Sequence, residues 1–223
     1  MAEECWDSDR SCRFCMRPDP WRIILSTDNF YVMLSLGPIV EGYTLVVARR
    51  HIPCCGSMPR SIVGEFGHLV GVVEESLTRV YGSCIAYEHG LTGSCMKEPH
   101  EPHCLHAHLH CVPVALDLPA YLGSFLPEKK LGNWGEFVAL QHESGTEHPM
   151  RPYLLAKDGC AIHVFDAPDR LPRQYLRRLV AGSFGSPQLA DWSTYPRYDI
   201  IRSGLSKVAP VVQRVFQELP SKE

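Results

Sequence analysis

Three histidines at alternating positions, His106, His108 and His110, constrain the fold of this chain more than any other feature. On a β-strand, side chains two residues apart point to the same face, about 6 to 7 Å from one another. A strand therefore aligns the three imidazoles and turns the intervening Ala107 and Leu109 to the opposite face, whereas a helix would scatter them. An imidazole that leaves water must find a polar partner. The segment thus predicts a strand with a functional histidine row, in preference to a polar strand face with incidental histidines.

The chemistry of imidazole leaves two functions open for this row. It could hold a catalytic metal, or one imidazole could attack a phosphate as a nucleophile while its neighbours donate hydrogen bonds. A histidine-rich metal hydrolase usually has carboxylates nearby, and the nearest ones here, Glu101 and Asp117, lie outside the alternating pattern. This weakens the metal-only interpretation, but the spacing alone does not choose between the two.

The composition is that of a folded protein without a general affinity for nucleic acid. Its 223 residues suit one domain, or one domain with a substantial appendage. Hydrophobic residues make up 45% and charged residues 21%, which excludes extended disorder, a collagen-like repeat and a coiled coil. The net charge of -3 offers no global positive field, so any nucleotide recognition must be local. The acidic N-terminus lacks a secretory pattern and no run approaches the roughly 18 apolar residues of a membrane helix, so we expect a cytoplasmic protein.

Periodicity and turn residues predict an α+β fold built on an antiparallel sheet. Apolar residues at helical spacing predict a long amphipathic helix over 60–81, which ends at Gly82. Strand-like runs rich in β-branched and aromatic residues are found at 21–26, 29–36, 43–47, 84–87, 105–114, 136–140, 153–156 and 161–165. Further helices are expected over 120–126, 172–181 and 198–219.

The histidine row and the segments before it resemble the histidine triad (HIT) superfamily of nucleotide hydrolases and nucleotidyltransferases. The signature of that superfamily is His-x-His-x-His followed by apolar residues, as in 106–112 here. The run from Pro38 to His51 is similar to the turn, strand and basic-histidine segment that precedes a long helix in the superfamily. Glu88-His89-Gly90 stands where the family often has Asn-x-Gly. The resemblance covers about residues 10 to 115, half of the chain.

The resemblance implies a covalent mechanism. His108, the middle histidine, would attack the α-phosphorus of a nucleotide and form a nucleotidyl-imidazole, which water or another acceptor then cleaves. His110 would donate to the phosphate oxygens as negative charge builds on them. Ser35 and His103 occupy positions where the family often has an acidic residue on the ribose hydroxyls and a small hydroxyl residue on the phosphate. His103 could serve as a leaving-group acid or a phosphate contact, or be an exposed loop histidine.

Two further segments resemble those of bacterial HIT-like proteins, namely the Glu-His-Gly before the histidine row and a Gln-Tyr-Leu-Arg-Arg helix after it. The apolar residues of that helix face the core, which leaves Arg177 or Arg178 able to reach a phosphate. A solvated basic helix face and a capped turn at Gly90 are the structural alternatives. The residues that we assign to substrate binding are Ser35, Glu88, His89, Gly90, Gln174, Arg177 and Arg178.

Cys12 and Cys15 form a Cys-x-x-Cys pair, which alone could be a redox pair, half of a metal site or a chance occurrence in a chain with 10 cysteines. A redox pair should follow a strand and open a helix, but this pair lies in an irregular segment with prolines close behind. In zinc-bearing HIT relatives, the other two ligands are the histidine that ends the first hairpin and the first histidine of the row. The resemblance therefore implies a structural zinc ion, without an open position for catalysis, on Cys12, Cys15, His51 and His106.

These patterns together predict a HIT-like catalytic domain with an N-terminal zinc-binding segment at residues 1–116, and an α+β extension at 117–223 packed on it. We expect a nucleotide hydrolase or nucleotidyltransferase whose substrate is a nucleotide or a nucleotide conjugate. The alternative is a nucleotide-binding or zinc-stabilised interaction protein without turnover. We expect neither extended nucleic acid nor a membrane as a partner, and either a monomer or a homodimer.

Overall fold

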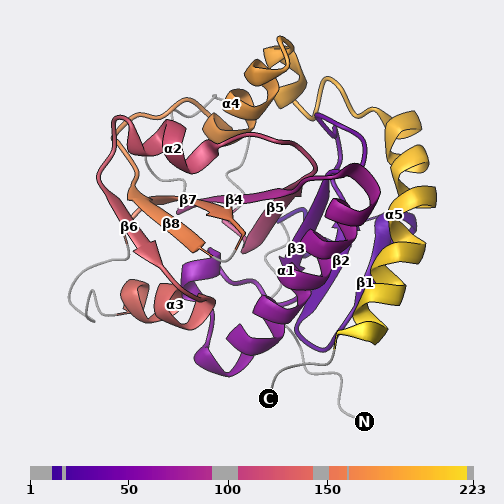
Figure 1. The fold of residues 1–223 in the computed structure, drawn as a ribbon, viewed down its shortest axis with the longest axis horizontal. Coiled ribbons are helices and arrows are strands. Elements are labelled where there is room, and N and C mark those ends of the chain that lie inside the picture. The colour runs from indigo at the N-terminus through magenta and orange to yellow at the C-terminus, as the bar shows by residue number, and fades with distance from the viewer. Residues whose placement is uncertain (1–11, 17–18, 92–104, 143–150, 160, 220–223) are drawn as a thin grey trace.

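A computed structural model of the chain describes residues 12–16, 19–91, 105–142, 151–159 and 161–219 (Figure 1). Within these residues, eight strands form one antiparallel sheet in the order β1-β2-β3-β5-β4-β7-β8-β6. The strands are β1 (Ile23–Ser26), β2 (Phe30–Leu34), β3 (Thr44–Ala48), β4 (Ile85–Gly90), β5 (His108–Val112), β6 (Glu128–Leu131), β7 (Tyr153–Asp158) and β8 (Ala161–Asp166). The α-helices are α1 (Arg60–Tyr81), α2 (Leu118–Gly123), α3 (Trp134–His142), α4 (Tyr175–Ser183) and α5 (Tyr198–Glu218). Short 3₁₀ turns are η1 (Pro20–Arg22), η2 (Cys55–Ser57) and η4 (Pro187–Ala190).

The α+β class with an antiparallel sheet is confirmed, and the long helix is confirmed with it. Helix α1 has the predicted bounds and ends at Gly82, whose φ of 87° is in the left-handed region that favours glycine. The Gly82 N–H donates to the Thr78 carbonyl and so satisfies one of the last carbonyls of the helix. Periodicity located this helix because its apolar face is continuous over the whole length.

Residues 136–140, which we expected to form a strand, belong to helix α3, and that prediction is wrong. Asn133 Oδ1 accepts from the Glu136 N–H at 2.9 Å, while the Glu136 carboxylate accepts from the Gly132 N–H at 2.7 Å. This reciprocal cap starts a helix that buries Trp134 and Phe137. The Asn-x-x-Glu pattern at 133–136 is the sequence signal that could have located this helix.

Strand β6 has no counterpart among the predicted strands. It is an exposed edge strand that pairs with β8, and its sequence is mostly charged. Charged side chains are common on edge strands, where they discourage pairing with other molecules. They also remove the alternation of apolar and polar residues by which a strand is located in a sequence.

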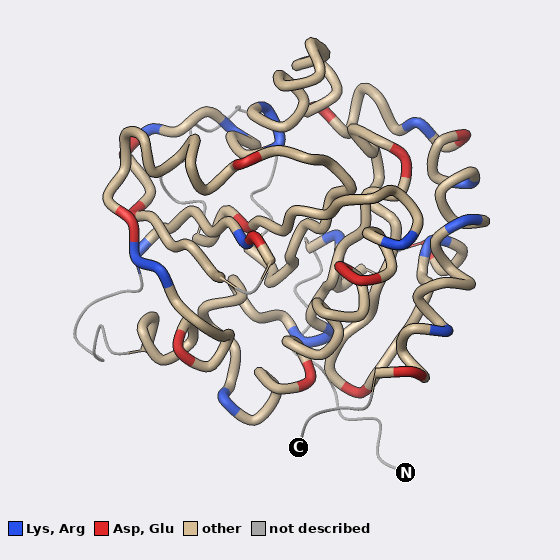
Figure 2. Tube along the Cα trace, in the orientation of Figure 1, with Lys and Arg blue, Asp and Glu red and all other residues tan. Residues whose placement is uncertain are grey.

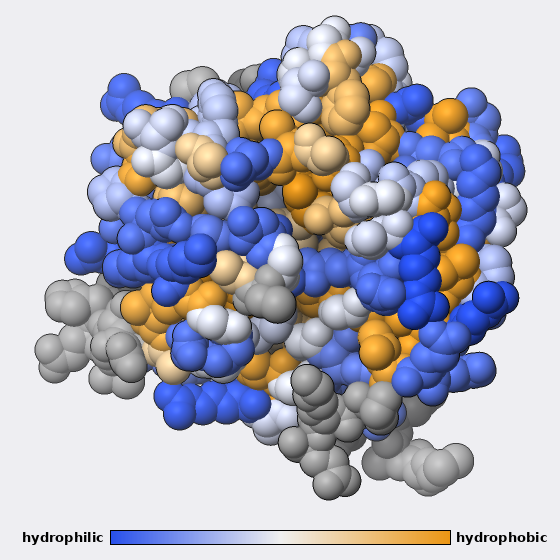
Figure 3. Space-filling model, in the orientation of Figure 1, coloured by the Kyte–Doolittle hydropathy of each residue, from blue (hydrophilic) through white to orange (hydrophobic). Residues whose placement is uncertain are grey.

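Helices cover both faces of the sheet and create two cores. On one face, α1 packs against α3 and α5, and apolar residues of all three meet the sheet. On the other face, α2, α4 and η4 cover a second core. Figure 1 shows α2 and α4 on one side of the sheet, and α1 and α3 on the other side. Figure 3 shows apolar residues gathered over α2 and α4, and the half-exposed Phe125 and Phe184 lie just beyond the ends of these helices.

Strand β5 lies in the interior of the sheet, between β3 and β4. Its alternation is as predicted: Ala107, Leu109 and Cys111 are buried in the core beneath α1. The histidines between them face the second core, where rings of that core contact His108 and His110. A continuous sheet thus holds the imidazole row rigidly between two hydrogen-bonded neighbours.

The sheet runs across the boundary that we predicted at residue 116. Strand β4, before the boundary, pairs with β7, after it, from Ala86↔Lys157 to Gly90↔Tyr153. The division into a domain at 1–116 and an extension at 117–223 stays a prediction. The two parts share one backbone hydrogen-bond network, so the second half can act directly on the strands that carry the histidines.

Two glycines of α1 provide a matched test of the packing between α1 and α3. An added Cβ at Gly71 would meet nothing within 4 Å, whereas one at Gly67 would lie 2.9 Å from Cδ1 of Trp134. Alanine is favoured over glycine in a helix, so we expect Gly71→Ala to raise the free energy of unfolding by about 0.5–1 kcal/mol. We expect Gly67→Ala to lower it, because the buried Trp134 ring must move. Urea denaturation at constant pH measures both changes, and a shift of the two midpoints in the same direction would contradict this packing.

Candidate functional site

His108 has a defined tautomer. Its Nδ1 lies 2.6 Å from the backbone carbonyl oxygen of His106. A carbonyl oxygen only accepts hydrogen bonds, so Nδ1 carries the proton and Nε2 carries the lone pair. Burial lowers the pKa of His108 to about 4, so the ring is neutral at pH 7. The arrangement leaves Nε2 as an unprotonated, nucleophilic nitrogen.

His110 lies next to His108, with 4.7 Å between the ring centroids. Its Nδ1 is 2.8 Å from the hydroxyl of Tyr43, and the Tyr87 ring stacks on it at a centroid distance of 5.0 Å. Burial also lowers the pKa of His110 well below its usual value. Two neutral imidazoles therefore stand side by side on one face of the sheet.

The segment with the two cysteines lies against the same row. The Phe14 ring, between Cys12 and Cys15 in sequence, has its centroid 4.8 Å from that of His108 and 5.2 Å from that of His106. These contacts place an apolar ring against the imidazole of the candidate nucleophile. The N-terminal segment is therefore part of the wall of the site.

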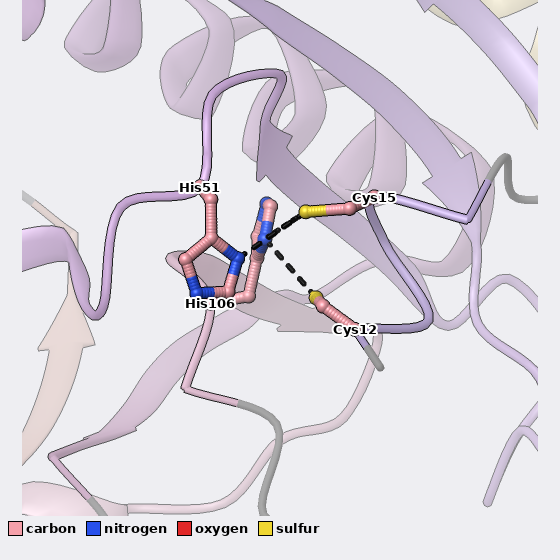
Figure 4. A group of neighbouring side chains, drawn as sticks. All are labelled: Cys12, Cys15, His51 and His106. Carbon is pink, nitrogen blue, oxygen red and sulfur yellow. Dashed lines mark hydrogen bonds between the residues drawn. The ribbon is translucent and has the colours of Figure 1, made fainter. Parts of the chain in front are cut away.

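Four side chains beside the row could hold a metal ion (Figure 4). The ligand atoms of Cys12, Cys15, His51 and His106 all lie within 4.8 Å of one another. Nδ1 of His106 is 3.4 Å from Cys12 Sγ and 3.6 Å from Cys15 Sγ, and Nδ1 of His51 is 3.2 Å from Cys15 Sγ. Typical zinc–sulfur and zinc–nitrogen bonds in a tetrahedron give S···N separations of about 3.5 Å. The donor set and its spacing therefore fit a tetrahedral metal ion.

The remaining nitrogen of His106 is also fixed. Nε2 of His106 lies 2.7 Å from the backbone carbonyl oxygen of Ala48, to which it must donate. Nδ1 is then unprotonated and available to a metal. Outer hydrogen bonds of this kind orient histidine ligands and fix their tautomers. The four residues that the resemblance implied as a metal set are thus assembled in one place.

Glu88 lies on the face of the sheet opposite the histidine row. The preceding residue on β4, Tyr87, stacks on His110, so Glu88 points to the other side. Its carboxylate accepts from the Cys55 N–H at 2.8 Å and from the Tyr153 hydroxyl at 2.5 Å. Burial raises the pKa of Glu88 to about 7. The carboxyl group therefore belongs to the core beneath α1, away from the imidazoles.

His89 and Gly90 complete the Glu-His-Gly segment. His89 is two residues from Tyr87 and shares the face of the histidine row. It is partly buried, and burial lowers its pKa to about 4. Gly90 is needed for space, because a Cβ there would lie 2.1 Å from Cζ of Tyr153. The glycine thus serves the packing of the Tyr153 ring that donates to Glu88.

The two arginines of α4 differ in their surroundings. Arg177 is buried and donates to the carbonyl oxygens of Gly37 at 2.7 Å and Ala190 at 3.1 Å. Arg178 is exposed, and its Nε donates to the Arg173 carbonyl at 2.8 Å. Arg177 therefore joins α4 to the turn before β3, and Arg178 is the arginine of the pair that faces solvent.

The other expected substrate residues are placed as follows. Ser35 is buried just after β2, and its hydroxyl donates to the Leu36 carbonyl at 3.1 Å. Gln174 precedes α4 in a left-handed backbone conformation with a φ of 55°. His103 lies outside the described residues. Substrate contacts by these three residues stay predictions.

Tyr43, Tyr87 and Phe14 contact the histidine row and were not anticipated as site residues. Tyr87 lies opposite His110 in the pairing of β4 with β5, and Tyr43 lies just before β3 on the other side of β5. Period-2 alternation predicts the face on which each ring lies, but it does not predict which strands are neighbours. These contacts with the histidine row therefore could not be predicted from the alternation without the strand order.

Comparisons with known proteins show weak similarity in sequence and in structure. No family model matches the chain. Zinc finger CCCH domain-containing protein 59 from Oryza sativa subsp. japonica is 23% identical over 200 residues, which cover 82% of this chain. The chain spans about a third of that protein, since the match covers 31% of its length. A hypothetical histidine triad nucleotide-binding protein from Sulfolobus tokodaii has a TM-score of 0.34 at 16% identity, over 41% of this chain and 59% of its own.

Lys and Arg residues are interspersed with Asp and Glu, for example along α5 (Figure 2). Among the helices in the described ranges, none has the length and apolar character that crossing a membrane requires.

The metal group generates a direct prediction. We expect the purified protein to bind one zinc ion per chain, and Cys15→Ala to lose it, because removal of one thiolate leaves three ligands. Loss of the ion should lower the melting temperature by several degrees, since metal binding stabilises the folded state. Zinc content by atomic emission and melting by calorimetry measure the two effects. Cys84→Ala, which changes a partly buried cysteine outside the group, is the control and should retain the ion. Full zinc content in Cys15→Ala would contradict the assignment.

The buried Glu88 generates a prediction about pH. Its folded-state pKa of about 7 is above the value of about 4.3 for an unfolded glutamate, so between these values only the folded state holds the proton. The contribution of Glu88 to the free energy of unfolding should therefore fall as the pH rises from 5 to 8, by an amount on the order of 3 kcal/mol. The lowered pKa values of His89 and His108 act in the opposite direction in both proteins, so the test is the difference between wild type and Glu88→Gln, which should change with pH by this amount. Denaturation of both proteins across this range measures the difference, and parallel pH profiles would refute the shift.

Proposed function

We propose that the protein is a nucleotide hydrolase or nucleotidyltransferase that acts at an α-phosphate through a covalent intermediate on His108. The observation that carries the proposal is the tautomer of His108. Its Nδ1–H is held by the His106 carbonyl at 2.6 Å, so Nε2 presents a lone pair from a rigid interior strand. A neutral imidazole with a fixed lone pair is the form in which histidine acts as a nucleophile.

The proposed reaction has two displacements. In the first, the Nε2 lone pair of His108 forms a bond to phosphorus, and the bond from phosphorus to the leaving-group oxygen breaks with its electron pair on that oxygen. The ring then carries a positive charge, which the carbonyl dipole of His106 stabilises through Nδ1–H. In the second, the oxygen of water or of another acceptor attacks phosphorus and releases its proton to solvent, and the phosphorus–nitrogen bond breaks with its electron pair on nitrogen. The nitrogen recovers its lone pair and the nucleoside monophosphate leaves or is transferred.

The candidate metal site includes His106, the residue whose carbonyl orients His108. We propose that Cys12, Cys15, His51 and His106 hold a structural zinc ion, whose four protein ligands leave no position for substrate. Such an ion would supply a rigid cross-link between the N-terminal segment, the residues after β3 and the start of β5. His106 then serves twice, because its side chain is a ligand and its carbonyl orients the nucleophile.

We retain two of the expected substrate residues as proposed contacts of the substrate. His89 shares the face of the histidines, and Arg178 offers an exposed guanidinium on α4. Arginine suits a phosphate because its planar group donates two parallel hydrogen bonds. We propose a nucleotide or a nucleotide conjugate as the partner of these groups.

The proposal is tested by trapping the intermediate. Wild type and His108→Ala are incubated with dinucleotides, nucleoside triphosphates and nucleotide sugars, and intact-protein mass spectra are recorded without acid, which cleaves phosphoramidates. We expect an adduct of one nucleoside monophosphate on wild type alone, and a loss of turnover of more than about 10³-fold in His108→Ala. The control is His68→Ala, which changes a histidine on α1 and should still form the adduct.

Two results would count against catalysis through His108. Unchanged turnover in His108→Ala would show that His108 is not the nucleophile. Nucleotide binding by wild type with neither an adduct nor turnover would favour a binding protein instead.

A further inference from the structure

We propose that Tyr43 is a positioning residue that holds His110 in the tautomer with its proton on Nε2, and that Tyr87 and Arg177 fix the direction of the Tyr43 hydroxyl. Arg177, from the second half of the chain, thereby acts on the site through the buried Tyr43 hydroxyl rather than through contact with substrate. The catalytic consequence rests on the proposed function, whereas the tautomer itself does not.

The three groups form a continuous chain of hydrogen bonds. The Tyr43 oxygen is 2.8 Å from Nδ1 of His110 and 2.6 Å from the Tyr87 oxygen. Tyr43 and Tyr87 are 0% and 1% exposed, so water does not compete for these bonds. Each phenol has one proton to donate, and the direction of the chain therefore decides which nitrogen of His110 is protonated.

Tyr87 determines the direction of the hydrogen bonds at one end of this series. Within the described residues, its hydroxyl has one hydrogen-bond partner, which is Tyr43. If Tyr43 donated to Tyr87, the Tyr87 proton would be buried without an acceptor, at a cost of about 1–3 kcal/mol. Donation from Tyr87 to Tyr43 avoids this cost. The Tyr43 oxygen then accepts from Tyr87, and its own proton is free to go to His110.

Arg177 favours the same direction. Its guanidinium carbon lies 5.0 Å from the centroid of the Tyr43 ring, and a guanidinium can only donate. Burial raises the pKa of Tyr43, and the positive charge of Arg177 opposes that rise. Because a guanidinium cannot accept a hydrogen bond, the Tyr43 proton cannot go to Arg177. With Tyr87 donating to Tyr43, the Tyr43 proton points to Nδ1 of His110.

Arg177 is itself held in place by backbone groups. It donates to the carbonyl oxygens of Gly37 and Ala190, which lie before β3 and at the end of η4. Its charge is therefore fixed relative to Tyr43, which follows the same turn. This explains why a buried arginine of α4 matters to a site on β5 that it does not reach directly.

The consequence is that neighbouring histidines have opposite tautomers. His108 has its proton on Nδ1 because a backbone carbonyl accepts it, and its Nε2 is a nucleophile. His110 has its proton on Nε2 because a phenol occupies Nδ1, and its Nε2–H is a donor to a phosphate oxygen. His108 can thereby attack phosphorus while His110 stabilises negative charge, although both side chains are imidazoles.

The tautomer is measured on the free protein by nitrogen-15 NMR with histidine labelling, with His110 assigned by its loss in His110→Ala. We expect the Nε2–H pattern for His110 and the Nδ1–H pattern for His108 in wild type. In Tyr43→Phe, the Nδ1 signal of His110 should move, because that nitrogen loses the proton donated by the phenol, and kcat should fall by about 10- to 100-fold with KM changed less than about 3-fold. Tyr87→Phe should retain the Nε2–H form, because within the described residues Nδ1 of His110 is then the acceptor for the buried Tyr43 proton.

The matched control is Tyr153→Phe, which also removes a buried tyrosine hydroxyl but on the opposite face of the sheet. It should leave the His110 signals and kcat unchanged. An Nδ1–H pattern for His110 in wild type would overturn the proposal, and so would a Tyr43→Phe variant with unaltered signals. If Tyr43→Phe moves the Nδ1 signal of His110 but the wild type turns over no nucleotide, the positioning by Tyr43 stands and the proposed function fails.

Discussion

The arrangement of the site depends on His106 more than on any other residue. Its Nε2 donates to the Ala48 carbonyl, its Nδ1 faces the two cysteine sulfurs, and its own carbonyl accepts from His108. One residue thus connects β3, the N-terminal segment and the start of β5. A shift of His106 would change the metal group and the orientation of the candidate nucleophile together, because backbone and side chain move as one unit.

The sheet separates two kinds of buried polar chemistry. On the face beneath α1, Glu88 accepts from Tyr153 and from the backbone of η2, and these bonds hold the turn against β4. On the other face, Tyr43 and Tyr87 surround His110. Adjacent residues of β4, Tyr87 and Glu88, serve the two faces because side chains alternate along a strand. Buried polar groups require partners, and here each set finds its partners on its own side.

The second half of the chain completes the scaffold of the first. Strand β7 extends the sheet beside β4, and α4 covers the core that contains the histidine row. The buried Arg177 of α4 reaches the turn before β3 through backbone carbonyls. The hydrogen bonds to these carbonyl oxygens offset the hydration that the guanidinium loses on burial, so a buried charge is tolerated there. Helix α4 thus contributes packing and a buried cation through Arg177, and its proposed phosphate contact is Arg178.

The sequence by itself determined the local features. Alternation predicted a strand through the histidine row, of which His108 and His110 lie on β5 and His106 just before it. The 3.6-residue period predicted α1, the chemistry of Cys12 and Cys15 raised a metal site, and the resemblance to HIT proteins added His51 and His106 as ligands. These features are local because each depends on the periodicity or residue type of a short segment. The tertiary structure decided which strands are neighbours, and with them the contacts of Tyr43 and Tyr87 with His110. It also decided that Arg177 is buried and that Glu88 faces away from the row. Strand order and helix placement follow from packing between residues far apart in the chain, which no local pattern encodes.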